Sequence, residues 1–355
     1  MTMFSHFVEW FRRSGFSVCA AVLLLAALAM GQVAARAQDA GPLYGAHGVS
    51  PQAVRQGILG SCYFHASIAA LAKVAPETLR NAINRNPGSG YQVRFFDGPE
   101  ELVFPEDVKY GRAHSFDRSD GDWVLVLMRG YAQREVRRSL AGAIQRSTLI
   151  PVYAKPVALS WLDQSGLLLV AYDRAIRYVV NQDGIMNKAA LKQALATQLS
   201  ALGLPAAEAQ ALGGFLEEKG FFDALELTVE QNGEVFGAYK SVGQGGIPDR
   251  VIGAFMGKGR SQLIADNRLL FDQLRRLHTG GVAMVAATWP TPRGAEYSRT
   301  DLLVPNHAYT LLDYDEATHI VSLRNPWGDH PGPDGVFTLP LAAFLRAYEF
   351  YSYSE

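Results

Sequence analysis

The sequence has few cysteines, few charged residues and no excess of either charge. Two cysteines occur in 355 residues, which excludes a small fold held together by many disulfides. Charged residues make up 19%, and Lys and Arg total 33 against 34 Asp and Glu, so a nucleic-acid binder with a strong positive excess is also excluded. The apolar content of 48% excludes a disordered chain. The length suits roughly one to three domains with a sizeable core.

Residues 1–37 have the layout of a secretory signal peptide. Arg12 begins a positively charged pair, Phe16–Met30 is apolar, and Ala35 and Ala37 supply the small residues of a cleavage site. We therefore expect cleavage after Ala37 and a mature protein in the periplasm or outside the cell. An uncleaved leader would instead anchor the protein, because the uncharged run is long enough to span a bilayer.

Cleavage would remove Cys19 and leave Cys62 as the only cysteine. In an exported protein a single cysteine is a buried inert thiol, an intermolecular bridge or a reactive nucleophile. Cys62 lies near the start of Ile58–Val74, whose apolar spacing predicts a helix that Pro76 ends. In the first turn of a helix, unpaired N–H groups and the helix dipole stabilise an anion. Gln56 is expected to add an amide donor for an oxyanion.

A nucleophilic cysteine needs a base, and the sequence contains eight histidines. His307 begins a predicted strand at 307–314, and the next predicted strand, 320–324, ends beside Asn325. Two adjacent strands joined by a turn would bring this histidine and this asparagine together, and the amide would then fix the imidazole tautomer. His65 follows the cysteine by one helical turn, but no neighbour in the sequence would orient its ring. We expect a supporting or wall role for His65.

The remaining pattern predicts an α-rich part at 38–262 that carries the cysteine and a β-rich part at 263–355 that carries the histidine and asparagine. Within the first part, residues 133–235 are rich in Ala and Leu and are interpreted as a mostly helical insertion. Periodicity predicts helices at 58–74, 123–131, 189–202, 206–218, 263–277 and 340–348, and strands at 91–96, 282–289, 307–314, 320–324 and 335–339.

These motifs together resemble those of the calpain family of papain-like cysteine proteases. The residues concerned are Gln56-Gly-Ile-Leu-Gly-Ser-Cys62-Tyr-Phe for the nucleophile, His307-Ala-Tyr for the histidine and Leu323-Arg-Asn325-Pro-Trp327-Gly for the asparagine. Segments that begin at Asp122 and Gly237 are similar to two further family segments, which are nearly continuous in calpains. Their separation here marks the insertion, and the resemblance covers most of the mature chain outside it.

The resemblance implies an α+β fold with the two lobes of a papain-like core. It implies Cys62 as nucleophile, His307 as general acid and base, and Asn325 as the residue that orients the histidine. It also implies Gln56 as oxyanion donor and Trp327 as the shield of the His–Asn hydrogen bond. The expected activity is that of an exported endopeptidase that cleaves proteins or peptides through a thioester, with a thiolate–imidazolium pair at neutral pH. The alternatives are a transglutaminase-like acyltransferase with the same triad and a catalytically silent peptide-binding protein.

The sequence departs from the family at several positions around these motifs. Ser61 and Tyr63 stand where calpains have Asp and Trp, Asn306 stands where they have Gly, and the tryptophan-bearing loop after Asp329 is replaced. No catalytic group is lost by these changes. The histidine spacing fits no zinc signature, so no metal ligand and no required cofactor are predicted. Calcium is suggested by the family resemblance alone. No nucleic-acid partner is expected, and no oligomeric state follows from the sequence.

Overall fold

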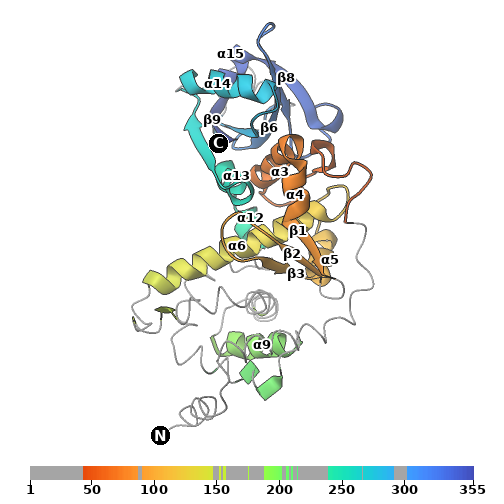
Figure 1. Cartoon of the computed structure of the whole chain (residues 1–355), viewed down its shortest axis with the longest axis vertical. Helices are drawn as coiled ribbons and strands as arrows, with labels where there is room; N and C mark the ends of the chain where they lie inside the picture. Colours follow the sequence, from red (N-terminus) through yellow and green to blue (C-terminus); the bar gives the residue numbers. More distant parts are fainter. Residues whose placement is uncertain are drawn as a thin grey trace.

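The computed structural model describes residues 43–86, 90–146, 188–201, 239–265, 267–291 and 302–355, with scattered positions between 152 and 214. These residues have an α+β fold with two separate antiparallel sheets, neither of which closes into a barrel. The larger sheet lies at one end of the molecule, next to helix α3 (Cys62–Val74), and the smaller sheet lies on the other side of that helix (Figure 1).

Six antiparallel strands form the larger sheet, in the order β4-β9-β5-β6-β7-β8. Their bounds are Gly259–Leu263 for β4, Met284–Thr288 for β5, Ala308–Asp315 for β6, Ile320–Arg324 for β7, Val336–Pro340 for β8 and Tyr348–Ser354 for β9. Helix α14 (Asn267–His278) packs on this sheet, and α15 (Leu341–Ala347) connects β8 to β9.

Strand β5 is buried along its whole length because helices cover both faces of the sheet. Side chains alternate between the faces of a strand. Accordingly Val285 belongs to the hydrophobic cluster around α3, whereas Met284 and Ala286 belong to the cluster around α14. Since α3 packs on β5 and β6, the helix that carries the cysteine is fixed to the strand that follows the histidine.

Three short strands form the smaller sheet: β1 (Ile83–Asn86), β2 (Gly90–Val93) and β3 (Glu101–Val103). Around it lie the helices α4 (Pro76–Ala82), α5 (Pro105–Ala113), α6 (Trp123–Arg146), α12 (Tyr239–Gly243) and α13 (Pro248–Met256). Several of these helices begin with a proline at the first position, where the missing N–H costs no hydrogen bond.

The structure confirms some predicted boundaries and corrects others. Strand β7 has its predicted bounds, and α3 ends at Val74 as predicted but begins at Cys62, because the preceding glycines and serine form a loop. The predicted helix at 123–131 continues to Arg146. The predicted helix at 263–277 begins only at Asn267, because Gly259–Leu263 pairs with β9. No sequence pattern predicted β9.

The predicted leader at 1–37 lies outside the described residues, as does most of the predicted insertion at 133–235. Within the insertion, the structure describes α9 (Lys188–Ala201), which agrees with the helix expected at 189–202. The expected division of the chain at residue 262 falls inside β4. None of the described helices combines the length and the apolar character needed to span a membrane.

A buried ion pair ties α6 to the smaller sheet. Arg137 donates to both carboxylate oxygens of Glu101, at 2.8 and 2.9 Å, and both residues are buried. We predict that Arg137→Met lowers the free energy of unfolding by about 3 kcal/mol, because it leaves a buried carboxylate without its cation. Chemical denaturation measures this change.

The double variant Glu101→Leu/Arg137→Met should recover most of the lost stability, since it removes both charges. The exposed pair Arg275–Glu316 is the matched control, and Arg275→Met should change the free energy of unfolding little. Equal losses for the buried and exposed pairs would contradict the prediction.

Candidate active site

A cavity of about 790 Å³ lies where the first turn of α3 meets the larger sheet. Cys62, His307, Gln56 and Trp327 all line it, and Asn325 is buried behind the histidine. The structure therefore brings together all five residues that the sequence predicted for one site. They come from three places: the loop before α3 together with the first residue of that helix, the residue just before β6, and the turn after β7.

Cys62 is the first residue of α3 and is partly exposed to the cavity. Burial raises the pKa of its thiol, while the backbone N–H groups of Ala308, Tyr63 and Cys62 itself lower that pKa to a smaller extent. Ala308 directly follows His307, so this contact places the sulfur beside the start of β6. The N–H groups of Cys62 and Tyr63 belong to the first turn, where no preceding carbonyl of the helix can accept them.

Contacts of both the ring and the backbone position His307. Its Nε2 lies 3.0 Å from Oδ1 of Asn325, and that oxygen also accepts the backbone N–H of Trp327 at 3.1 Å. Because Oδ1 accepts, Nε2 carries the proton, and Nδ1 is the basic nitrogen. The indole of Trp327 lies 5.0 Å from the imidazole, measured between ring centroids, and covers it. The backbone N–H of His307 donates to Oγ1 of Thr288 at 3.0 Å.

Burial also determines the charge of the histidine. It lowers the pKa of His307 to about 4, and the hydrogen bond with Asn325 offsets only part of this shift. The sequence predicts a thiolate–imidazolium pair at rest. Because burial disfavours the charged form of both groups, the structure instead favours a neutral thiol beside a neutral imidazole.

Close backbone contacts hold the loop that carries Gln56. Its N–H donates to the carbonyl of Pro326 at 2.8 Å, and its side-chain Nε2 donates one hydrogen to the carbonyl of Leu59 at 2.6 Å. Gly57 lies so near the next segment that a Cβ would be 1.9 Å from the carbonyl oxygen of Ser115. Close packing therefore requires glycine at position 57. Nε2 of Gln56 uses one of its two hydrogens for Leu59, so the second hydrogen is left to donate to a ligand.

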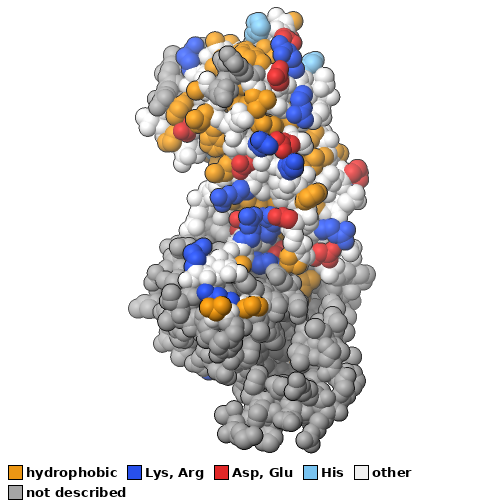
Figure 2. Space-filling view, turned by 60° about the vertical axis from the view of Figure 1, so that its left-hand side comes forward, with side chains coloured by type: hydrophobic (Ala, Val, Ile, Leu, Met, Phe, Trp, Pro, Cys, Tyr) orange, Lys and Arg blue, Asp and Glu red, His pale blue; other side chains and the backbone are white. Residues whose placement is uncertain are grey.

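The rest of the cavity wall offers apolar and charged surface to a ligand. Ile58 is 69% exposed and Ile247 is 42% exposed, and both lie on this wall. Arg118, Asp329 and Glu349 also line the cavity. On the face of the molecule drawn in Figure 2, side chains of both charges are interspersed.

Sequence reasoning missed the polar residues behind the loop. His65 was expected to have a supporting role, but no partner was predicted for it. Its ring is buried and lies 3.1 Å from Asp117, whose segment runs antiparallel to Gln56. The signal available was a histidine in an otherwise apolar helix. Nothing in the sequence indicates which distant carboxylate faces it.

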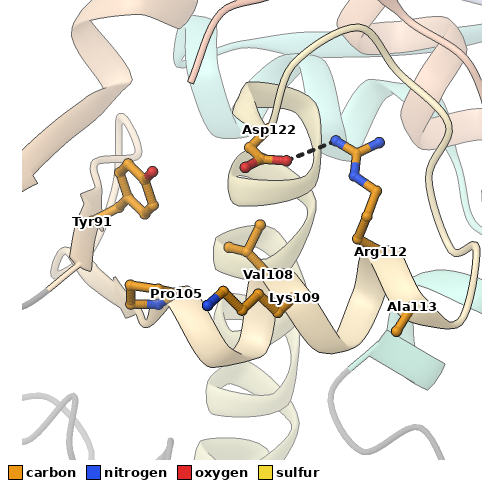
Figure 3. A pocket seen from close by; sticks show the side chains of 7 residues that line it. All are labelled: Tyr91, Pro105, Val108, Lys109, Arg112, Ala113 and Asp122. Carbon is orange, nitrogen blue, oxygen red and sulfur yellow. Dashed lines mark hydrogen bonds and ion pairs between the residues drawn. The ribbon is translucent and has the colours of Figure 1, made fainter. Parts of the chain in front are cut away.

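A second cavity, of about 410 Å³, lies between α5, β2 and the start of α6 (Figure 3). Its lining residues are Tyr91, Pro105, Val108, Lys109, Arg112, Ala113 and Asp122. Cys62 and His307 are not among them. Across the described residues, no three His, Cys, Asp or Glu side chains form a group that could hold a metal ion.

The charge state of the pair can be tested by spectroscopy. We predict that the ultraviolet absorbance of thiolate, taken as wild type minus Cys62→Ser, is close to zero at neutral pH and rises only in alkali. His307 should titrate near pH 4, as followed by the NMR signals of its ring. Alkylation of Cys62 by iodoacetamide needs a neutral base, so its rate should fall as the pH drops through that value. A full thiolate signal at neutral pH would contradict the prediction.

The comparisons with known proteins identify no family for this chain. The sequence matches no model of a known family and no curated protein. Among solved structures, one match is the crystal structure of PepW from Lactobacillus rhamnosis HN001 (DR20), at 11% identity over 100% of this chain and 92% of that one. Its TM-score is 0.29, which is too low to support an argument about fold or function.

Proposed function

We propose that the protein is a calpain-like cysteine endopeptidase that uses Cys62, His307 and Asn325. One observation carries the proposal: the imidazole is oriented by Asn325 at 3.0 Å and lies in the same cavity as a cysteine at a helix start. This is the arrangement that a base-activated nucleophile needs, with a third group to orient the base. An inert thiol in the core would need none of these neighbours.

We also propose the two-lobed papain-like core that the family resemblance implies. The separation of the described core into two hydrophobic clusters supports it, with α3 in one cluster and most of the larger sheet in the other. The cysteine would come from the first lobe, and the histidine and asparagine from the second. The predicted leader further suggests that the enzyme acts outside the cytoplasm.

In the proposed first step, the sulfur of Cys62 attacks the carbonyl carbon of a peptide bond while its proton moves to Nδ1 of His307. The tetrahedral intermediate then collapses, the C–N bond breaks, and the imidazolium gives its proton to the leaving amine. A thioester remains. A neutral resting pair suits these reaction steps. The imidazolium then forms only as the attack moves negative charge onto the substrate oxygen.

Deacylation reverses the roles of the same groups. A water molecule gives one proton to Nδ1 of His307 and attacks the thioester carbon. The C–S bond breaks, the sulfur recovers the proton from the imidazolium, and the carboxylic acid leaves. In both steps we propose that the N–H of Cys62 and the amide of Gln56 donate to the oxyanion.

An epoxide probe that reacts with active-site thiols tests the nucleophile. We predict that purified mature protein is labelled on Cys62 at neutral pH and that His307→Ala reduces the labelling rate by about 10²-fold or more, since the base is lost. His278→Ala, at the exposed end of α14, is the matched control and should label like the wild type. Labelling no faster than a free model thiol would contradict the assignment.

The products then separate the proposed function from its alternatives. New amino termini in an unfolded protein substrate, detected by mass spectrometry, would support an endopeptidase. Amide or isopeptide products would indicate an acyltransferase instead. Labelling without any product would indicate a binding protein that has kept a reactive thiol.

The oxyanion donor has its own test. We predict that Gln56→Ala lowers kcat by about 10²–10³-fold, as removal of one preorganised donor does in other acyl-transfer enzymes, with little change in KM. Gln52→Ala, which removes an exposed amide shortly before the loop and outside the cavity lining, is the matched control and should leave kcat unchanged. An unchanged kcat for Gln56→Ala would remove the amide from the mechanism.

A further inference from the structure

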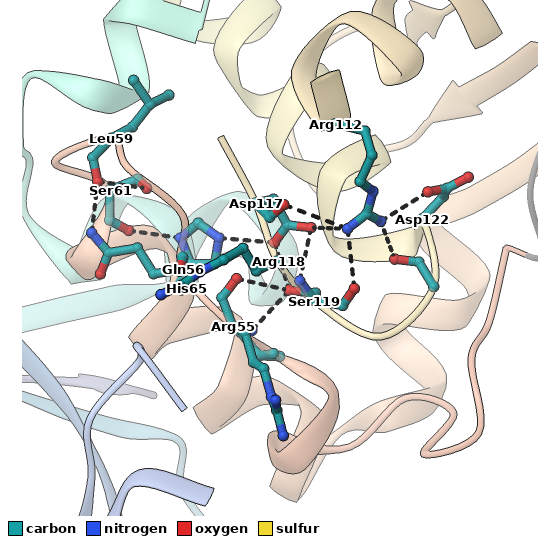
Figure 4. Close-up of polar contacts among 12 residues, drawn as sticks. Arg55, Gln56, Leu59, Ser61, His65, Arg112, Asp117, Arg118, Ser119 and Asp122 are labelled. Atoms are coloured by element: carbon teal, nitrogen blue, oxygen red, sulfur yellow. Dashed lines mark hydrogen bonds and ion pairs between the residues drawn. The ribbon is translucent and has the colours of Figure 1, made fainter. Parts of the chain in front are cut away.

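His65 is completely buried one helical turn after the nucleophile, and both of its ring nitrogens have a partner. Nδ1 lies 3.0 Å from the carbonyl oxygen of Ser61, and Nε2 lies 3.1 Å from Oδ1 of Asp117 (Figure 4). A backbone carbonyl only accepts hydrogen bonds. Nδ1 must therefore carry a proton in this contact.

The contacts of Asp117 identify it as an ionised carboxylate. The backbone N–H of Ser119 donates to Oδ2 at 3.2 Å, and the hydroxyl of Ser119 donates to Oδ1 at 2.5 Å. The guanidinium of Arg112 lies 3.5 Å from Oδ2. With donors on both oxygens, the carboxylate is an acceptor for His65 as well, so Nε2 also carries a proton. The ring then satisfies both contacts only as an imidazolium.

The charges of this cluster agree with that protonation state. Arg112 also pairs with Asp122 at 2.8 Å, so the cluster holds two carboxylates and one guanidinium. A protonated His65 balances the second carboxylate. Without that proton, the fully buried Asp117 would share a single, partly exposed arginine with Asp122, and an unbalanced buried charge is costly.

The cluster acts on the two groups that are proposed to bind the oxyanion. The carbonyl of Ser61 accepts from Nδ1 of His65 and also from the backbone N–H groups of Phe64 and His65, both at 3.0 Å. It belongs to the same rigid peptide unit as the N–H of Cys62, so the ring adds a third donor that helps to fix the direction of this N–H. The segment of Asp117 also pairs with the other donor loop. Its neighbour Arg118 donates from its backbone N–H to the carbonyl of Arg55 at 2.9 Å and from Nε to the carbonyl of Gln56 at 3.1 Å.

We propose that His65, held as an imidazolium by Asp117, is a positioning residue for the oxyanion site. Through the carbonyl of Ser61 it aims the N–H of Cys62 at the cavity. A cation on that carbonyl also polarises the peptide unit, which makes its N–H a stronger donor. The inference rests on the proposed acyl-transfer function, because only that chemistry creates an oxyanion at this place.

Two reagents distinguish a positioning role from a merely structural one. A peptide aldehyde forms a hemithioacetal with the thiol and places its oxygen in the oxyanion site. Iodoacetamide alkylates the same sulfur but creates no oxyanion. For each variant, the aldehyde affinity is compared with the alkylation rate on the same active-site-titrated sample, so that the result does not depend on the folded fraction.

For His65→Leu we expect aldehyde affinity and kcat to fall by about 10- to 100-fold, with KM changed far less, since a slightly misplaced donor costs up to this much. The alkylation rate should fall much less than the aldehyde affinity. Asp117→Asn keeps the shape of the side chain but removes its charge, and it should give a smaller loss of the same kind. The double variant His65→Leu/Asp117→Leu keeps the test available if the single variant does not fold.

His114→Leu is the matched control. The ring of His114 makes the same contact with a carbonyl four residues earlier, that of Tyr110 at 2.8 Å, but it is exposed and lies at the end of α5. Its loss should change neither the aldehyde affinity nor the alkylation rate. In folded protein labelled with ¹⁵N-histidine, the ring signals of His65, assigned by their absence from the His65→Leu variant, should show a proton on each ring nitrogen, as the two contacts require.

The possible failures can be told apart. Equal losses of aldehyde affinity and alkylation rate in folded His65→Leu, or no loss of either, would overturn the positioning role. An unprotonated ring nitrogen in His65 would overturn the imidazolium. If the wild type neither binds the aldehyde nor cleaves peptides while its thiol still alkylates, the proposed function itself fails.

Discussion

Helix α3 packs across strands β5 and β6, and this contact brings Cys62 to His307. The helix can lie close to the sheet because its inner face consists mainly of alanines and a few larger apolar side chains. The buried hydroxyl of Thr310, on β6, donates to the carbonyl of Ala66, in α3, at 2.8 Å. Thr310 lies shortly after His307 in the sequence, and Ala66 lies shortly after Cys62. A shift of the helix on the sheet would therefore separate sulfur and imidazole directly.

Burial by the same packing determines the electrostatics of the site. The thiol and the imidazole lie where burial disfavours the charged form of each, and this favours a neutral pair at rest. Behind them, a second layer of buried polar groups begins with the contact between His65 and Asp117. This second layer holds the peptide groups that face the cavity.

How far the sequence could predict the site depended on the distance between the partners along the chain. His307 directly precedes β6 and Asn325 directly follows β7, and a short turn joins these neighbouring strands. Their hydrogen bond therefore followed from local pattern, and β7 had its predicted bounds. Strand β9 was missed because it pairs with β4 and β5 far away in the chain. Its aromatic and polar residues have no clear alternation of their own. Asp117 was missed for the same reason, since its role depends on a helix that precedes it by many residues.

The sequence by itself determined which groups are available for chemistry: the thiol of Cys62 at a glycine-led helix start, with histidine and asparagine motifs to match it. Residue type, local spacing and turn chemistry are enough for that, because they act over a few residues. Only the tertiary structure decided the burial of the cysteine and the histidine, the hydrogen-bond partners of Gln56 and His65, and the crossing of the Asp117 segment behind the loop. These depend on burial and on contacts between distant segments, which no local pattern contains.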